Sequence, residues 1–328
     1  MPELKYPLFD GERLWDGACV TVSDGRIISV TACAPSECGD GFLMPALIDA
    51  HTHMESMSQV ESMLKCGIAA TCDVNGSQSL IRSSKQLRIV SSAGMIMGRT
   101  LNPKNTVARY RDAGAQYIKV LLFNPLAVGK RTLSGIVDAA HEQNLKVVVH
   151  ATSVATVKQA VEAGADILLH MPMKEEYPVG LAETIARKGI SVAPTLVMME
   201  TFSQSGRNGY RPEHYENARK AVNLLYKTGV RILAATDANS GSFAPGVSFG
   251  PSMHREMELL VDAGMTPTEV LASATSVNAD LFGMSDTGLI KAGKRADLLL
   301  IDGRPDEVIT DTAKIRQMWI GGESVCCS

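Results

Sequence analysis

Two patterns of hydrophobic and polar positions alternate along the middle of the chain. Short, continuous apolar runs, such as residues 46–50 and 147–149, are followed by longer segments in which apolar residues recur with the helical period, such as residues 154–163. Continuous apolar runs are typical of strands that are buried on both faces of a parallel sheet. The alternation therefore predicts parallel strands that are joined and covered by helices.

Eight such strands are predicted, at residues 46–50, 67–74, 88–95, 116–122, 145–150, 166–170, 190–197 and 230–237. Helices are predicted at residues 55–66, 106–113, 133–144, 154–163, 181–188, 215–228, 252–263 and 268–281. Eight strand–helix units close naturally into a (β/α)8 TIM barrel, so the fold class predicted here is α/β. An open, doubly wound sheet is the alternative, but no glycine-rich phosphate loop follows the first strand.

The two ends of the chain have a different pattern, which predicts β structure. Two β-rich runs, residues 19–22 and 27–30, flank an Asp24-Gly25 turn, which is a strong hairpin signal. Residues 296–302 and 315–320 read as strands near the other end. Each piece is too small to bury a core alone. We therefore expect residues 1–42 and 288–328 to form one small, β-sandwich-like domain beside a barrel of residues 43–287.

Composition narrows the class of protein. The chain has 328 residues, 45% of them hydrophobic and 20% charged, as expected of a soluble globular protein with a large core. A net charge of −3 without a long Lys/Arg run argues against a nucleic-acid partner or a membrane surface. No signal-peptide layout is evident, and no apolar run reaches the roughly 18 residues of a membrane span.

Cysteine usage indicates the compartment. Seven cysteines are scattered along the chain without a CxxC motif, which predicts a reduced, cytoplasmic protein. The adjacent pair Cys326-Cys327 is not expected to be a metal site. The Ser/Gly-rich segments 203–209 and 239–250 are predicted to be mobile loops over the mouth of the barrel.

Candidate chemistry lies at the ends of the predicted strands. His51 and His53 follow the first apolar run, and residues two apart on a strand project from the same face. Imidazole is the commonest neutral metal ligand. Four more polar residues lie in or at the end of later strands: Lys119, His150, His170 and Asp237. Each alone could be a hydrogen-bonding core residue or a helix cap, but together at one rim they predict a metal site.

These motifs resemble the amidohydrolase superfamily, in its dipeptidase-like, imidazolonepropionase-related branch. The resemblance covers nearly the whole chain and rests on residues 44–53, 117–120, 147–151, 167–170, 235–238, 275–279 and 288–302. It implies hydrolysis at a centre of two divalent metal ions, usually zinc, with a bridging hydroxide. The chain departs from the family pattern at Thr152, where relatives often carry a second histidine, and this departure bears on peptidase activity rather than on the metal centre.

The resemblance also implies a role for each residue. Lys119 would carry CO2 as a carbamate that bridges the two metals, which is reasonable because burial favours the neutral amine. His51, His53 and Asp237 would hold one metal, and His150 and His170 the other. Asp237 would take a proton from the hydroxide and pass it to the leaving group.

Three functions remain open from the sequence. The first is a metal-dependent hydrolase of an amide, lactone, carbamate or similar bond of a small molecule. The second is a mononuclear-metal deaminase of the same superfamily, against which Lys119 argues. The third is a non-enzymatic relative, which would be expected to have lost ligands. A homo-oligomer is possible.

The substrate contacts predicted from the sequence are Met171, Thr195 and His254. Methionine adapts to irregular surfaces, so Met171, with Met173, Met198 and Met199, could line an apolar pocket wall. Ordinary core filling is the alternative for these methionines, and a solvated helix position is the alternative for His254.

Overall fold

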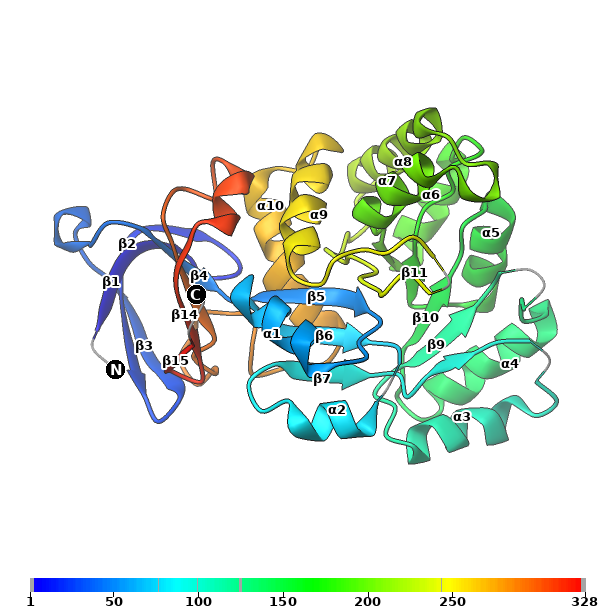
Figure 1. Cartoon of the computed structure of the whole chain (residues 1–328), viewed down its shortest axis with the longest axis horizontal. Helices are drawn as coiled ribbons and strands as arrows, with labels where there is room; N and C mark the ends of the chain where they lie inside the picture. Colours follow the sequence, from blue (N-terminus) through cyan, green and yellow to red (C-terminus); the bar gives the residue numbers. More distant parts are fainter. Residues whose placement is uncertain (1–2, 76, 99, 124–125, 243, 326–328) are drawn as a thin grey trace.

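The barrel predicted for the middle of the chain is present in the computed structural model, which describes residues 3–75, 77–98, 100–123, 126–242 and 244–325 (Figure 1). One run of parallel strands comprises β5 (Leu47–Thr52), β6 (Ile68–Asp73) and β7 (Arg88–Ser91). The other comprises β8 (Met95–Ile96), β9 (Ile118–Leu121), β10 (Val147–His150), β11 (Ile167–Leu169) and β12 (Ser191–Ala193).

The segment 230–238 closes the barrel between β12 and β5. It was predicted as a regular strand, but it pairs through isolated bridges, Val192 with Ile232 and Thr52 with Ala238. The N–H of Leu233 donates to the carbonyl of Val192 on one side. On the other side the N–H of Asp237 donates to the carbonyl of His51, at 2.9 Å. The closing segment is therefore attached to β5 directly at the histidine motif.

Two predicted strands end earlier than the apolar pattern indicated. The predicted strand 88–95 is divided into β7 and β8, because Ala93 and Gly94 between them have positive φ angles of 54° and 114°. The predicted strand 190–197 ends at Ala193. Thr195, with a φ of 50°, then turns the chain into helix α7 (Leu196–Ser205). The prediction of a loop over 203–209 was accordingly wrong for its first three residues, which end this helix.

The remaining helices follow the predicted order and cover the outside of the barrel (Figure 1). They are α1 (Met57–Lys65), α3 (Pro103–Asp112), α4 (Lys130–His141), α5 (Val154–Ala163), α6 (Val179–Arg187), α8 (Tyr215–Lys227) and α9 (Pro251–Asp262). The predicted helix 268–281 consists of α10 (Pro267–Ala272), a π-helical turn (Ser273–Val277) and α11 (Asn278–Leu281). Helix α2 (Gln78–Ser83) was not predicted.

The barrel core is divided by the alternation of side chains along each strand. In β10, Val147 and Val149 belong to the cluster between the barrel and its helices. Val148 belongs to a second cluster with Ile48 and Ala70 from other strands. Both faces of each strand are therefore apolar, which is why the sequence showed continuous runs instead of alternation.

The two ends of the chain combine into one β unit, as predicted. Its strands form a continuous seven-stranded sheet in the order β15-β14-β13-β4-β1-β2-β3. The bounds are β1 (Leu4–Phe9), β2 (Leu14–Ser23), β3 (Arg26–Ala32), β4 (Phe42–Pro45), β13 (Leu298–Ile301), β14 (Ile315–Ile320) and β15 (Glu323–Val325). Strands β1 and β15 were not predicted, and β4 crosses the domain boundary expected after residue 42.

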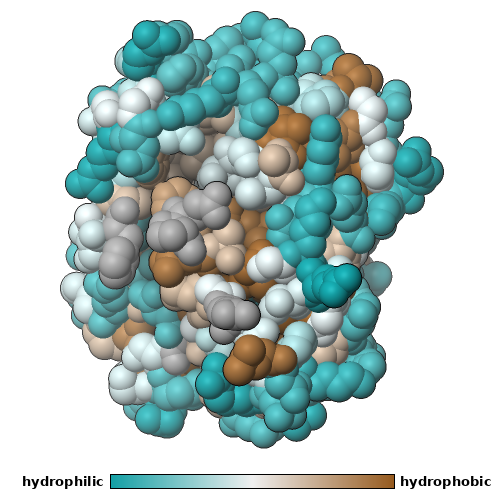
Figure 2. Space-filling model, turned by 90° about the vertical axis from the view of Figure 1, so that its right-hand side faces the viewer, coloured by the Kyte–Doolittle hydropathy of each residue, from teal (hydrophilic) through white to brown (hydrophobic). Residues whose placement is uncertain are grey.

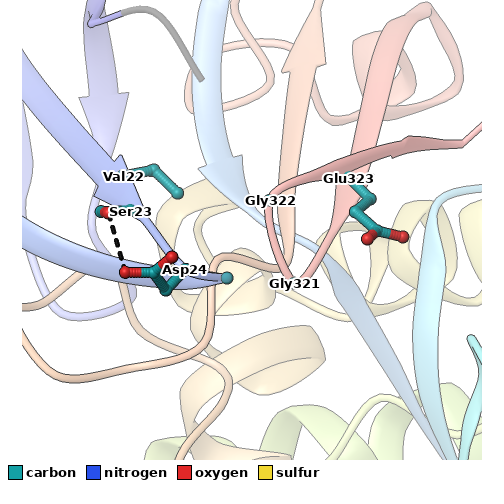
Figure 3. A pocket seen from close by; sticks show the side chains of 7 residues that line it. Val22, Ser23, Asp24, Gly321, Gly322 and Glu323 are labelled. Atoms are coloured by element: carbon teal, nitrogen blue, oxygen red, sulfur yellow. Dashed lines mark hydrogen bonds between the residues drawn. The ribbon is translucent and has the colours of Figure 1, made fainter.

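The two faces of this sheet have different partners. Phe42, Met44 and Leu299 belong to the main core that includes the barrel helices. Leu43 and Leu298, one residue along, belong to a separate cluster within the terminal unit. The hairpin tips of β2–β3 and β14–β15 enclose a pocket of about 380 Å³, with Asp24 on one side and Glu323 on the other (Figure 3).

Two further sequence predictions concern the whole chain. Within the described ranges, no helix has the length and apolar character needed to cross a bilayer. Among the described residues, the cysteines at positions 19, 33, 38 and 72 are free thiols. The pair Cys326-Cys327 lies outside the described residues.

Candidate metal centre

All six residues predicted as metal ligands lie in one region of the barrel, Lys119 inside its strand and the others toward the carboxyl ends. His51 is in β5, and His53 follows this strand. His150 ends β10, and His170 directly follows β11. Lys119 lies in β9, the strand that pairs directly with β10. Asp237 lies in the segment that closes the barrel. The parallel strands therefore bring together side chains that are far apart in the sequence.

Asp237 lies at the centre of the group. Its Oδ1 is 3.1 Å from Nε2 of His51 and 3.0 Å from Nε2 of His53. Its Oδ2 is 3.9 Å from Nδ1 of His170. His51, His170 and Asp237 are all buried, and each offers a ligand atom within 4.8 Å of the others. Two imidazoles and a carboxylate at this spacing form a group suited to a divalent metal ion.

His150 and Lys119 extend this group. The ring of His150 lies edge-on to that of His170, with centroids 4.4 Å apart. Its Nε2 is buried and has no hydrogen-bond partner among the described residues. Leaving such an atom unpaired costs about 1–3 kcal/mol, so a ligand is expected there. Lys119 is buried, and its Nζ is 3.5 Å from Nε2 of His51. The donors of this set fit a metal centre.

Burial controls the protonation of the basic groups. Burial, reinforced by the charge of Lys119, lowers the pKa of both His51 and His150 to about 3. The pKa of His170 is also lowered well below its ordinary value, again chiefly by burial. These imidazoles are therefore neutral at pH 7, which is the form that binds metals. Burial likewise lowers the pKa of Lys119 to about 7, although Asp237 opposes this shift.

Asp237 remains a carboxylate in the same surroundings. Burial by itself would raise its pKa, but the electrostatic interaction with the His170 ring and hydrogen bonds from His51 and His53 outweigh burial. The pKa of Asp237 is therefore held well below its ordinary value. The cluster thus combines neutral imidazoles with an ionised carboxylate.

Backbone geometry at this rim is unusual. Seven described non-glycine residues have positive φ angles, and three of them are here: His170 at 70°, Thr195 at 50° and Asp237 at 58°. Such conformations are disfavoured for L-residues and persist where surrounding contacts enforce them, often at functional sites. The hydroxyl of Thr195 is 2.8 Å from Nδ1 of His170, so one strained residue is bonded to another.

Asp49 is a buried residue of the site that the sequence interpretation missed. Its Oδ1 accepts the N–H groups of His51, at 3.1 Å, and Thr236, at 3.0 Å. Its Oδ2 accepts the hydroxyl of Thr236 at 2.6 Å. Asp49 thereby connects β5 to the residue that precedes Asp237. Asp49 could have been recognised from the sequence, because it lies inside an apolar run two residues before His51. An acid buried in such a run needs specific hydrogen-bond partners.

The three predicted substrate contacts all lie in buried positions. Met171 is 1% exposed and packs in the main core. Thr195 is fully buried against His170. His254 is buried on α9, and its Nδ1 is 3.0 Å from the hydroxyl of Thr312 in the C-terminal part of the chain. This contact joins α9 to the C-terminal part of the chain.

The mouth of the barrel has apolar residues that the sequence interpretation also missed. Phe123, just beyond β9, is 46% exposed, and its ring centroid is 6.2 Å from that of His150. Leu126, Met97 and Leu101 are exposed on this loop and on the one after β8. The two loops are joined by a 2.7 Å bond from Gly98 N–H to the carbonyl of Leu126. Figure 2 shows apolar surface gathered around a hollow on the side toward which β5 and β6 point.

A parallel barrel with histidines and an aspartate gathered at the carboxyl ends of its strands defines a class of barrel enzymes that use a metal ion. Comparison with known families identifies the family to which the chain belongs within this class. The model of the Amidohydrolase family matches residues 42–325, and the chain belongs to this family. In this member of the family, the buried group of His51, His170 and Asp237 is the candidate metal site.

Relatives by sequence are distant. The chain is 27% identical to ochratoxinase of Aspergillus niger over 256 residues, which cover 74% of this chain and 46% of the relative. It is 29% identical to imidazolonepropionase of Cutibacterium acnes over 168 residues, which cover 50% of this chain and 37% of the relative. The matches thus span less than half the length of these curated relatives.

Solved structures share the fold over the full length. A Xaa-Pro dipeptidase with bound methionine has a TM-score of 0.82 at 18% identity, covering 98% of this chain and 99% of that chain. The ochratoxinase of A. niger has a TM-score of 0.81 at 20% identity, covering 98% and 95%. At these identities the likeness establishes the barrel with its terminal β-sheet domain.

Proposed function

We propose that the protein is a metal-dependent hydrolase that cleaves an amide, lactone, carbamate or similar C–N or C–O bond of a small molecule. The observation that carries this proposal is the buried cluster of His51, His170 and Asp237. The relatives of this protein include an ochratoxinase. A molinate hydrolase has the same fold, with a TM-score of 0.80 at 16% identity, covering 99% of this chain and 94% of that chain. These names support small-molecule hydrolysis.

The cluster has enough donors for two divalent ions, with zinc the best candidate. His51, His53 and Asp237 would hold one ion, and His150 and His170 the other. Lys119 would join them after carbamylation, in which its neutral amine forms an N–C bond to dissolved CO2 and releases a proton to solvent. The lowered pKa of Lys119, about 7, supplies the neutral amine this reaction needs. When bound, a metal pair lowers the pKa of a shared water toward about 7 and polarises a substrate carbonyl.

The protein groups would then position the substrate and move a proton. Oδ1 of Asp237 is engaged by two histidines, whereas its Oδ2 is 3.9 Å from the ring of His170, too far for a hydrogen bond. Oδ2 is therefore the atom suited to accept a proton from the attacking water and to deliver it to the leaving nitrogen or oxygen.

The substrate proposed for this site carries an apolar or aromatic group. Phe123 lies beside His150 at the mouth and is half exposed, and Leu126, Met97 and Leu101 extend this apolar surface over two neighbouring loops. A cluster of exposed apolar side chains beside a polar reaction centre is typical of a small-molecule site.

Metal analysis tests the first part of the proposal. After loading with zinc and bicarbonate, elemental analysis should find close to two ions per chain, and intact mass spectrometry under native conditions should find the added mass of one CO2. A Lys119→Met variant replaces the amine with an unbranched apolar side chain that suits the buried position. It should retain the fold but bind about one ion or fewer. Saturation of the wild-type protein at one ion, with Lys119 unmodified, would contradict a bridged pair.

A substrate panel tests the second part. Amides, lactones and carbamates should be offered to the zinc-loaded enzyme in matched pairs that differ in an aromatic or a polar substituent. The proposal expects hydrolysis of at least one bond class, with the aromatic member of the pair having the lower KM. Release of ammonia from an aminated ring, without cleavage of any panel bond, would favour the deaminase instead.

A further inference from the structure

Glu256 is a buried acid outside the metal cluster that has no role in the proposed reaction. It lies on α9 with 0% exposure. Burial, with smaller contributions from the charges of Asp49 and Glu200, raises the pKa of Glu256 to about 8. Carboxyl groups are rarely buried unless specific donors hold them. The donors of Glu256 therefore indicate what it does.

These donors are the first two N–H groups of helix α7. Leu196 N–H donates to Oε1 at 3.0 Å, and Val197 N–H donates to Oε2 at 2.7 Å. The first N–H groups of a helix lack partners within the helix, so acceptor oxygens from elsewhere in the protein must satisfy them. Glu256 therefore fixes the start of α7 from a different helix, 60 residues away along the chain.

The residue directly before α7 contacts the metal cluster. Thr195 is the N-cap of α7, fully buried and in a left-handed conformation with a φ of 50°. Its hydroxyl is 2.8 Å from Nδ1 of His170. A metal-binding histidine is typically oriented by a hydrogen bond to its other ring nitrogen, which also determines the tautomer. The contacts thus run without interruption from Glu256 to α7, to Thr195 and to His170.

We propose that Glu256 is a positioning residue for the metal centre: by holding the first turn of α7, it keeps the Thr195 hydroxyl where it accepts Nδ1–H of His170 and leaves Nε2 to bind metal. Glu256 itself touches neither metal nor substrate. The inference rests on the proposed metal site, but it is tested by metal affinity and needs no known substrate.

The same two helices offer a matched control. Arg255, the neighbour of Glu256, is partly exposed and pairs with Glu200 in the middle of α7, with nitrogen–oxygen distances of 2.8 and 3.3 Å. An Arg255→Gln variant removes this α7–α9 contact and leaves the start of α7 intact. It therefore separates general docking of the two helices from the specific effect on Thr195.

The experiment measures zinc affinity by competition with a chromogenic chelator, for the full chain and its variants. Glu256→Gln keeps the volume but turns an amide N–H toward a backbone N–H. Removing such supporting contacts typically weakens metal binding by about 10–100-fold. We expect this loss for Glu256→Gln and for Thr195→Val, near-normal affinity for Thr195→Ser, and less than a twofold change for Arg255→Gln. The double variant Glu256→Gln/Thr195→Val should bind zinc no more weakly than the weaker single variant, because both act through His170.

Several results would overturn the inference. A folded Glu256→Gln variant with wild-type zinc affinity would be sufficient to overturn it. An Arg255→Gln variant that loses as much zinc affinity as Glu256→Gln would also overturn it. If Glu256→Gln does not fold, the comparison of Thr195→Val with Thr195→Ser decides, since equal affinities would show that the hydroxyl does not orient His170. A wild-type protein that binds no zinc would overturn the proposed function as well, whereas the variant results overturn this inference only.

Discussion

Asp237 combines features that would each be unfavourable alone. It is a buried carboxylate in a left-handed backbone conformation, with a φ of 58°. The histidines around it hold its pKa well below the ordinary value against the effect of burial. Asp49, through Thr236, anchors the backbone just before it. The conformation and charge of this one residue are thus maintained by partners from several strands.

Replacement of Asp237 by asparagine tests its role in proton transfer. Asp237→Asn keeps the shape and one ligand oxygen but removes the basic oxygen atom. General acid–base catalysis by a placed side chain contributes about 10²–10⁴-fold, so kcat should fall by at least about 10²-fold on any substrate that the panel identifies. Metal content must be measured in parallel, because a lost ion would imitate a lost base. Two bound ions and near-normal turnover in the variant would assign the proton to another group.

At the scale of elements, helix α9 carries two buried ionisable side chains in different directions. Residues two apart in a helix project about 200° apart, so His254 and Glu256 reach opposite sides. Glu256 faces the start of α7, and His254 contacts Thr312. One helix therefore connects the metal side of the barrel with the C-terminal part of the chain.

The pH dependence of stability should reveal His254. Burial lowers its pKa to about 4, although the carbonyl of Cys66 and the charge of Glu258 oppose this shift. Between pH 6.5 and 4 the unfolded chain binds a proton at this residue and the folded chain does not, so the free energy of unfolding falls as the pH falls. His254→Gln should reduce this loss by on the order of 2 kcal/mol.

The measurement is urea denaturation of the metal-free wild type and His254→Gln at several values between pH 7.5 and 4.5. The other buried histidines are present in both proteins, so their contributions cancel in the difference. Parallel curves of unfolding free energy against pH would show that His254 does not contribute.

At the scale of the whole molecule, the β unit depends on both ends of the chain. Strand β13 pairs with β4 on one side and with β14 on the other. Met318 and Ile320 of β14, and Val325 of β15, belong to the same buried cluster as the barrel helices. The C-terminal strands therefore complete both the terminal sheet and part of the main core.

Truncation after Lys314 should abolish soluble expression. It removes β14 and β15, exposes the edge of β13 and uncovers apolar core residues, a combination that favours aggregation. The control is Met318→Ala, a fully buried position where the change should cost about 2–5 kcal/mol but keep every strand. Soluble yield and circular dichroism of both proteins give the result. A soluble, folded truncation would show that the terminal sheet tolerates the loss of these strands.

The order and type of most elements, and the residues that could meet at one rim, follow from the amino-acid pattern alone. Both depend on local information. Buried parallel strands require continuous apolar runs, and in a barrel the ends of these strands must converge. Residues such as His51, His150 and His170, which directly end or follow such runs, were therefore recognisable without a structure. The hairpin at Asp24-Gly25 was recognisable for the same local reason.

The partners of the buried polar residues, by contrast, become visible only in the folded molecule. The run that ends in Val197 has the same pattern as a strand, but after the turn at Thr195 its Val197 N–H donates to Glu256, from a helix far along the chain. The contact of His254 with Thr312, 58 residues away, likewise leaves no signal in the sequence. Such hydrogen bonds have no period in the sequence, because they depend on distances between elements that become defined only when the core packs.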